Sequence, residues 1–238
     1  MTRKKNFLKS ILDGCNMLDI KSDDRVLEIG SGSRPRKRSD ILCDKYIESN
    51  DERACGDNIV IDERPFVVAD ALALPFKDKS FDYVIASHIL EHVIDPYQFV
   101  NELMRVAKRG YIETPSELGE KIFGWQFHKW IVRLKDDTIM MRRRMEESPF
   151  GEYFHKMYHN NVLFAEVVDS QFPHYYIQYQ WKDTIKLLIE NDADKNVKYS
   201  VTNKVIQTQS RSRILIIKLM TYLLSGILRI IRHFRKYE

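Results

Sequence analysis

The chain has 238 residues, 44% apolar and 30% charged, which is typical of a soluble globular protein with one sizeable core. The net charge is +4, and much of the excess is confined to residues 34–38 and to the last 28 residues. This local bias argues against a general nucleic-acid-binding surface, so no nucleic-acid partner is expected. The three cysteines lack metal-ligand spacing and no long apolar signal segment begins the chain, which predicts a reducing, cytoplasmic setting.

The first half of the chain predicts an α/β fold. Residues 5–18 have apolar side chains at helical spacing and predict an amphipathic helix. Asp95 as N-cap, Pro96 at the first helical position and Gly110 as the stop predict a second helix. Five short apolar runs read as buried parallel strands, at residues 25–30, 40–44, 66–70, 81–87 and 110–115. Strand, helix and strand in that order imply a doubly wound α/β sheet.

The second half of the chain is less regular. Residues 116–173 are rich in aromatic, His and Arg side chains, with helical patches but no clear strand, and are interpreted as an insertion over the sheet that could act as a substrate lid. Residues 174–183 and 196–203 alternate at period two and predict late edge strands. We expect one domain over residues 1–205 and a basic amphipathic C-terminal helix over residues 206–238.

The turn after the first predicted strand carries the first functional signal, in the sequence VLEIGSGSRPRKRSD. In open α/β sheets this turn borders the ligand, where the strand order reverses. Gly30 and Gly32 let the backbone approach a ligand closely. The third glycine of a dinucleotide fingerprint is replaced by Pro35, and Glu28 would oppose a polyanion and favour a cationic ligand. The turn therefore disfavours a nicotinamide oxidoreductase.

Acidic residues follow the next two predicted strands. Asp44 ends the second strand, where a carboxylate can accept hydrogen bonds from both hydroxyls of a ribose. Asp70 follows the third strand, where it could accept a hydrogen bond from an adenine amino group beside the backbone of Ala71.

Combined, these motifs resemble the class I S-adenosylmethionine-dependent methyltransferases, specifically the type 11 group, over roughly residues 24–115. The matching residues are Glu28-Ile-Gly-Ser-Gly32, Asp44, Asp70 with Leu74-Pro-Phe76, Ser80-Phe-Asp82 and Leu90-Glu-His-Val93. The resemblance implies S-adenosylmethionine as the cofactor. It assigns Glu28, Gly30, Ser31 and Gly32 to the methionine part, Asp44 to the ribose, Asp70 with Ala71 to the adenine, and Ser87 with His88 to the open side near the methyl group.

The sequence departs from that family in two places. Only twelve positions separate Gly32 from Asp44, which is too short and too polar for the helix that the family usually has there. The usual Pro-Gly-Gly turn before the fifth strand is reduced to residues 108–110, Lys-Arg-Gly, which predicts a tightened loop.

His88 is the predicted general base, because a histidine needs little tuning to have a pKa near the working pH. His92 is given a structural role. No metal is expected at His88, Glu91 and His92, because no further ligand is evident in the sequence. Rival bases in the insertion are His128, His155 and His159.

Three further features each leave two interpretations open. The basic residues Arg34, Arg36, Lys37 and Arg38 form either a solvated loop or a patch for an anionic substrate. The aromatic side chains of the insertion form either core or a platform for a sugar or lipid-linked sugar.

Residues 211–238 have basic ends and a longest uncharged run of ten residues, 219–228, which is too short to span a membrane. They fit an in-plane helix on an anionic membrane, or a helix docked on the core or on a partner subunit.

The leading hypothesis is an enzyme that methylates an oxygen of a sugar or lipid-linked saccharide in cell-envelope glycan synthesis, as a peripheral protein at the inner membrane face. One alternative is a methyltransferase of a lipophilic small molecule such as a quinone. Another is a noncatalytic scaffold for a membrane-bound partner, which the intact set of Glu28, Gly30, Gly32 and Asp70 argues against.

Overall fold

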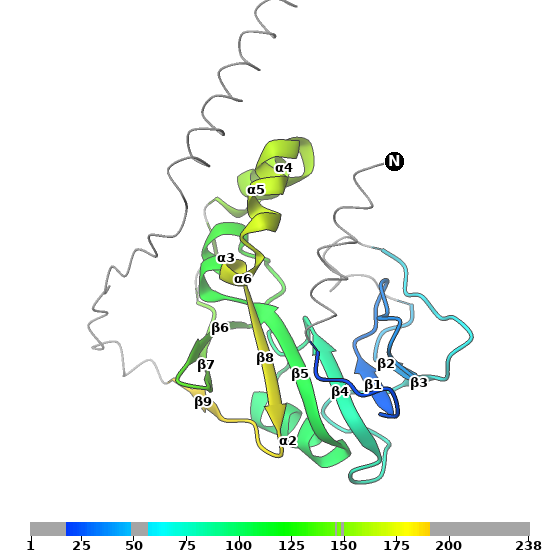
Figure 1. The fold of residues 1–238 in the computed structure, drawn as a ribbon. Coiled ribbons are helices and arrows are strands. Elements are labelled where there is room, and N and C mark those ends of the chain that lie inside the picture. Colours follow the sequence, from blue (N-terminus) through cyan, green and yellow to red (C-terminus); the bar gives the residue numbers. More distant parts are fainter. Residues whose placement is uncertain (1–17, 49–56, 146, 149, 191–238) are drawn as a thin grey trace, which may run out of the picture. The chain divides into compact units, whose positions relative to one another are not determined.

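The computed structural model describes residues 18–48, 57–145, 147–148 and 150–190 (Figure 1). The chain divides into two compact units, residues 1–194 and 195–238, and every described residue belongs to the first. The C-terminal helix, the strand expected at 196–203 and nearly all of the N-terminal helix are predictions that lie outside the described residues.

The main sheet has six strands in the order β3-β2-β1-β4-β5-β8 (Figure 1). They are β1 (Val26–Ile29), β2 (Ile41–Asp44), β3 (Phe66–Val68), β4 (Phe81–Ser87), β5 (Ala107–Pro115) and β8 (Tyr176–Lys182). The first five are parallel, and β8 pairs antiparallel with β5. Because β2 and β3 lie on one side of β1 while β4 and β5 lie on the other, the strand order reverses beside β1. The expected α/β sheet of mostly parallel strands is confirmed, and its switch point is at the carboxyl ends of β1 and β4.

Helix α2 (Pro96–Val106) connects β4 to β5 and begins as the sequence predicts. The Asp95 side chain accepts a hydrogen bond of 3.0 Å from the backbone N–H of Gln98. Pro96 occupies the first turn, where no N–H is needed. Between β1 and β2 the structure has turns and no helix, as the short polar segment predicts.

The predicted stop of α2 at Gly110 is wrong. The helix ends at Val106, β5 begins at the next residue, and Gly110 lies inside β5. A Cβ at Gly110 would lie 2.4 Å from the carbonyl oxygen of Val84. Glycine is therefore required there by close packing between strands, and the tightened 108–110 segment is part of the strand itself.

The expectation that the insertion holds no strand is also wrong. Strands β6 (Trp130–Lys135) and β7 (Thr138–Arg143) form an antiparallel hairpin, and β9 (Leu187–Ile189) pairs parallel with β7. The two residues between β6 and β7, Asp136 and Asp137, have positive φ values of 46° and 60°. Two left-handed residues in a two-residue loop are typical of the tightest hairpin turns.

Four helices occupy the rest of the insertion: α3 (Glu117–Phe123), α4 (Gly151–Asn160), α5 (Val162–Ser170) and α6 (Phe172–Tyr175). Helix α3 begins directly after β5, where Ser116 is the N-cap and accepts a hydrogen bond of 3.1 Å from the N–H of Gly119. Helix α6 leads directly into β8, the neighbour of β5. Both helices therefore lie at the edge of the sheet where β4 and β5 end (Figure 1).

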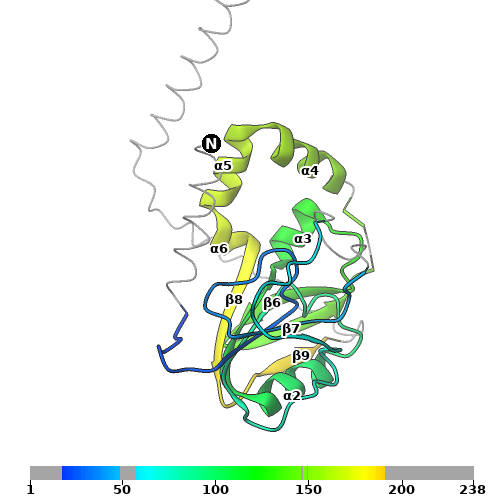
Figure 2. The ribbon, with the colours of Figure 1, turned by 90° about the vertical axis from the view of Figure 1, so that its right-hand side faces the viewer.

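The main core lies on the face of the sheet that packs against α2 and the smaller sheet (Figure 2). It combines Leu27, Ile29, Val84, Ala86 and Ile112 of the main sheet with Phe99 and Leu103 of α2 and with Trp130, Val132, Ile139 and Met141 of the hairpin. The opposite face buries Val26, Tyr83, Ile85 and Tyr111. No helix of the described ranges is long and apolar enough to cross a membrane.

Candidate active site

The glycine turn after β1 is anchored on the end of β2. Gly30 and Gly32 both adopt left-handed backbone conformations, with φ of 66° and 53°. The N–H of Gly30 donates to the carbonyl of Cys43 at 2.7 Å, and the N–H of Gly32 donates to Oδ2 of Asp44 at 3.0 Å. A Cβ at Gly32 would meet no atom closer than 3.8 Å, so the turn is open on that side. Ser31 Oγ is buried without a hydrogen-bond partner among the described residues.

Glu28 joins β1 to the polar loop that follows the turn. Its Oε2 accepts hydrogen bonds from the backbone N–H of Arg36 at 2.8 Å and from Ser39 Oγ at 2.6 Å. Burial raises the pKa of Glu28, and these two hydrogen bonds oppose the increase. Glu28 therefore holds the shortened loop in place, and its contact with a cofactor stays a prediction.

Asp44 and Asp70 lie at the ends of the neighbouring strands β2 and β3. Asp44 Oδ1 accepts a hydrogen bond of 3.1 Å from the N–H of Tyr46. Asp70 accepts a hydrogen bond of 2.7 Å from Lys45 Nζ, which lowers the pKa of the carboxyl group, and one of 2.9 Å from the N–H of Leu72. A carboxylate has about four lone-pair sites, so both groups can accept further hydrogen bonds from a ligand.

The basic run does not form a uniform patch. Arg36 reaches across the sheet edge, where Nη2 donates to Ser87 Oγ at 3.1 Å and lies 3.7 Å from Glu113 Oε1. Arg38 turns back and donates to the backbone carbonyls of Lys21 and Asp24. Arg36 is thus the basic residue that the fold brings to the ends of β4 and β5, which the sequence pattern did not distinguish from its neighbours.

His88 follows β4 directly and has a φ of 58°, an uncommon value for a non-glycine residue. Its Nδ1 lies 3.3 Å from Glu91 Oε1 and its Nε2 lies 3.5 Å from Glu113 Oε1. Desolvation lowers the pKa of His88, but the hydrogen bonds and charges of the two carboxylates outweigh it and raise the pKa to about 10. A base must be deprotonated before it acts, and this arrangement favours the protonated ring. The role of His88 as a base stays a prediction.

Glu113, near the end of β5, is a site residue that sequence reasoning missed. It is buried, and Oε2 accepts hydrogen bonds from the Tyr111 hydroxyl and from Gln178 Nε2, the latter at 3.3 Å. Burial raises the pKa of Glu113, but His88, Tyr111 and Arg36 together lower it to about 2. A carboxylate directly after the apolar pair Tyr111-Ile112, near the end of the strand, is the sequence signal that could have identified it.

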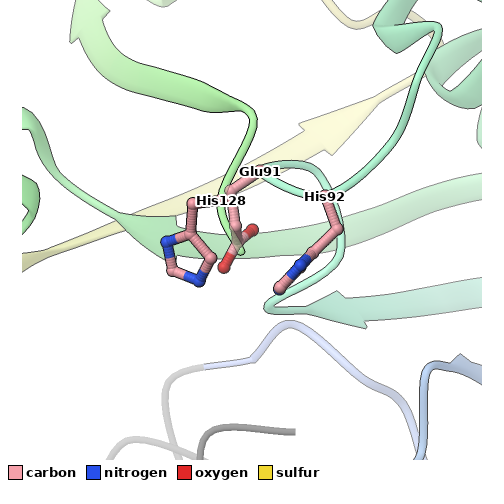
Figure 3. A group of neighbouring side chains, drawn as sticks. All are labelled: Glu91, His92 and His128. Atoms are coloured by element: carbon pink, nitrogen blue, oxygen red, sulfur yellow. The ribbon is translucent and has the colours of Figure 1, made fainter. Parts of the chain in front are cut away.

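A second polar group lies beside His88, where the insertion brings His128 next to Glu91 and His92 (Figure 3). One ligand atom of each residue lies within 4.8 Å of the other two. Burial lowers the pKa of His92 to about 4, so its imidazole is neutral at neutral pH. The sequence offered no further ligand near Glu91 and His92, and the fold supplies one from a distant segment. His155 and His159 lie on α4 instead.

The aromatic side chains of the insertion pack largely on one another. The ring of Phe123 contacts Trp125 and His155, in each case with 5.4 Å between centroids, and it also contacts Tyr158 and Tyr175. This packing favours the core interpretation for these residues. Tyr153 is exposed on α4 and remains available to a substrate.

Residues 42–112 match the family model of the type 11 methyltransferase domain. Over this segment the chain matches the class I methyltransferases of type 11. This methyltransferase domain belongs to an enzyme family that uses S-adenosylmethionine, which is the cofactor that the family implies.

Three proteins illustrate how the methyltransferase domain relates to known ones. Norajmaline N-methyltransferase of Rauvolfia serpentina is 35% identical over 100 residues, which cover 38% of this chain and 34% of that protein. The 27-O-demethylrifamycin SV methyltransferase of Amycolatopsis mediterranei is 32% identical over 121 residues, covering 43% and 44%. Demethylmenaquinone methyltransferase of Corynebacterium efficiens is 30% identical over 124 residues, covering 49% and 53%. The chain thus spans between a third and about half of the length of these relatives, and their names specify different acceptors.

The groups at the switch point of the methyltransferase domain fit S-adenosylmethionine. Its ribose hydroxyls and its adenine amino group need acceptors, which Asp44 and Asp70 can supply, and its carboxylate needs a cation or a donor. The unpartnered Ser31 hydroxyl is such a donor, and the open side of Gly32 leaves room for a ligand beside the turn.

Proposed function

We propose that the protein transfers a methyl group from S-adenosylmethionine to a small-molecule acceptor. The observation that supports this most strongly is the turn with two left-handed glycines at the point where the strand order reverses. Asp44 at the end of β2 accepts a hydrogen bond from that turn, and Asp70 follows the neighbouring strand β3. S-adenosylmethionine supplies, when bound, a methyl group on a positively charged sulfur.

The residues of the chain then contribute alignment and exclusion of water, which are the main requirements of an in-line displacement at carbon. Glu28, Gly30, Ser31 and Gly32 hold the methionine part, Asp44 the ribose, and Asp70 with Ala71 the adenine. Ser87 ends β4 and His88 follows it, and both face the methyl group, with His88 as the catalytic residue that contacts the acceptor. Arg36 and Glu113 fix the positions of Ser87 and His88.

For the acceptor we propose an oxygen of a sugar or lipid-linked saccharide of the cell envelope. Arg142 of β7 donates to Glu117 of α3, which begins directly after β5, and Tyr153 of α4 is exposed; such groups suit a hydroxylated ligand. A lipophilic acceptor such as a quinone is the second candidate, favoured by the relative named demethylmenaquinone methyltransferase. A noncatalytic scaffold is the third.

We further propose that residues 211–238 bring this cytoplasmic enzyme to the inner face of an anionic membrane. Basic residues lie at both ends of this apolar segment, as in helices that lie in the membrane plane. A lipid-linked acceptor and a quinone would both be reached from that position.

The first experiment is isothermal titration of the full chain with S-adenosylmethionine, S-adenosylhomocysteine and NAD. We expect the first two to bind and NAD not to bind. Gly32→Ala should weaken S-adenosylmethionine binding by about tenfold or more, because its methyl group enters the open space beside the turn where the cofactor is proposed to bind. The left-handed conformation costs alanine about 1 kcal/mol, which lowers stability rather than affinity. Absence of binding by the unmodified chain would favour the scaffold.

Gly124→Ala is the matched control for this titration. Gly124 also has a positive φ, 54°, but a Cβ there would lie 2.2 Å from the Cβ of Ser148, away from the glycine turn. It should lower the free energy of unfolding and leave cofactor affinity unchanged. Equal effects of the two substitutions on affinity would show that the cofactor does not bind at the glycine turn. Methyl transfer to a nucleotide sugar, a lipid-linked saccharide and a demethylated quinone then identifies the acceptor class.

A further inference from the structure

Three potential ligand residues converge beside the candidate active site. Glu91 and His92 lie on the segment between β4 and α2, and His128 lies in the insertion just before β6. Figure 3 shows the Glu91 carboxylate between the two imidazole rings. One ligand atom from each residue lies within 4.8 Å of the others.

Two atoms of this group are buried without a partner. Glu91 is fully buried, and its Oε2 has no hydrogen-bond partner among the described residues, whereas its Oε1 contacts His88. His92 Nδ1 is likewise buried and has no hydrogen-bond partner among the described residues. Leaving a buried polar group unsatisfied costs about 1–3 kcal/mol, and more for a charged one, so such groups in native proteins call for a ligand, a water or an ion.

A neighbouring carboxylate orients His128. Its Nδ1 forms a close hydrogen bond with Glu120 Oε1 of α3, and both side chains are buried. Because Nδ1 is occupied, Nε2 is the nitrogen left for a ligand. A carboxylate on the far nitrogen of a histidine is the usual support of a metal-binding imidazole.

The two segments are also fastened to each other. The backbone N–H of Lys129 donates to the carbonyl of Glu91 at 2.8 Å, and Lys129 Nζ donates to the carbonyl of His92 at 2.8 Å. Trp130 Nε1 donates to the carbonyl of Val93 at 2.8 Å. His92 stacks on Phe127, with 5.5 Å between ring centroids and 9° between planes. The ligands therefore rest on a defined frame, as a binding site requires.

We propose that Glu91, His92 and His128 bind one divalent transition-metal ion of the Zn²⁺ class. Two imidazoles and one carboxylate are a common set for such ions, while Mg²⁺ and Ca²⁺ prefer oxygen ligands. In a tetrahedral site, ligands about 2.0–2.2 Å from one ion lie about 3.3–3.6 Å from one another, so binding draws a pair that lies near the 4.8 Å limit together by about 1 Å. Three protein ligands leave at least one coordination position for another molecule.

The test is titration of the tag-free full chain, after treatment with a chelator, with Zn²⁺, Mn²⁺ and Mg²⁺ separately. We expect Zn²⁺ to bind one-to-one with micromolar or tighter affinity and to raise the melting temperature, because it binds the folded state. Mg²⁺ should bind at least about 100-fold more weakly. No Zn²⁺ binding by the unmodified chain would overturn the proposal. S-adenosylmethionine is absent from these titrations, so their outcome is separate from that of the methyl-transfer proposal.

Variants assign the ion to these residues. Glu91→Gln and His128→Gln, which approximately preserve side-chain size, should each weaken Zn²⁺ binding at least about 100-fold, and Glu120→Gln about 10- to 100-fold through the orientation of His128. His159→Ala, an exposed histidine of α4, should bind Zn²⁺ as the unmodified chain does. Unchanged binding in the first two variants, or equal loss in His159→Ala, would refute the site. If a variant does not fold, the visible absorption spectrum of Co²⁺ bound to the unmodified chain tests the site instead. Strong absorption bands of a four-coordinate ion with nitrogen ligands are expected, and the weak bands of an ion held only by water oxygens would refute the proposal.

Discussion

Glu113 shows how the carboxyl ends of the strands assemble charged groups that are far apart in the chain. It lies between His88 after β4 and Arg36 from the loop after β1, and Gln178 of β8 donates to it from the antiparallel edge strand. A buried carboxylate is stable only with such partners. Its partners come from elements before and after it in the sequence, so the group depends on the sheet order.

Glu113→Gln should make the protein less stable at neutral pH by at most about 3 kcal/mol, the linkage value of a pKa near 2 against an ordinary value near 4.5. Because the pKa in the folded state is the lower one, this contribution is fully present above about pH 5 and is lost as the pH falls toward 2. Urea unfolding of both proteins at pH 7, 5 and 4 measures it. The difference should be similar at pH 7 and 5 and smaller at pH 4.

Glu152→Gln is the control for this measurement. Glu152 pairs with Lys156 on the exposed surface of α4, where an ion pair contributes little. The free energy of unfolding of the Glu152→Gln variant should equal that of the unmodified chain at every pH. A difference for Glu113→Gln that grows on acidification would show that the carboxylate is not held in this network.

At the scale of the elements, two connections between strands shape the surroundings of the site. The segment between β1 and β2 is a loop that Glu28 closes, and the insertion contains a hairpin whose loop has only two residues. Side chains of Trp130, Val132, Ile139 and Met141 bury the inner face of that hairpin. Both turns matter for the site, because the first carries Arg36 and the second belongs to the element that follows His128.

Asp137→Gly should stabilise the protein by about 0.5 kcal/mol, because glycine adopts the φ of 60° found there without steric cost. The ion pair of Asp137 with Lys186 has 3.6 Å between atoms and is exposed, so its loss should matter little. Thermal or urea unfolding measures the change. Asp137→Ala is the companion variant and should lower stability, since a methyl side chain disfavours a left-handed residue. Equal losses in both variants would contradict the turn conformation.

At the scale of the whole molecule, the described unit contains the complete candidate site, while the strongest membrane signal of the sequence belongs to the second unit. A basic residue near an anionic membrane surface contributes about 1 kcal/mol of binding, so the basic residues of the C-terminal segment are the ones to change. The proposed cofactor site and the proposed membrane segment can therefore be tested separately in the intact protein.

Arg229→Glu combined with Arg232→Glu should weaken binding of the full chain to vesicles that contain anionic lipid by at least about tenfold, and should leave S-adenosylmethionine affinity unchanged. Co-sedimentation with vesicles measures the first and calorimetry the second. The control is the double variant Lys135→Glu and Lys156→Glu, which makes the same change of net charge at two exposed residues of the first unit. Equal weakening in the control, or equal binding to neutral vesicles, would count against a membrane role for the segment.

Local sequence rules were enough for the five parallel strands and the cap of α2, and the resemblance to a known family supplied the kind of cofactor. Each of these depends on neighbouring residues, on the spacing of apolar side chains or on a short motif. The same rules failed at Gly110, because its requirement comes from contact with Val84 on another strand. They also missed the hairpin, whose charged outer positions obscured its alternation.

The chemistry around the turn was decided by tertiary structure. Arg36 and Glu113 come together because β1, β4 and β5 end at one edge of the sheet. His128 joins Glu91 and His92 because backbone hydrogen bonds fasten the insertion to the segment after β4. The sequence by itself determined the fold class, since periodicity and turn motifs are local, and its resemblance to a known family implied the cofactor. Only the folded chain determined which charged side chains meet, since that depends on the order of strands and on the path of the insertion.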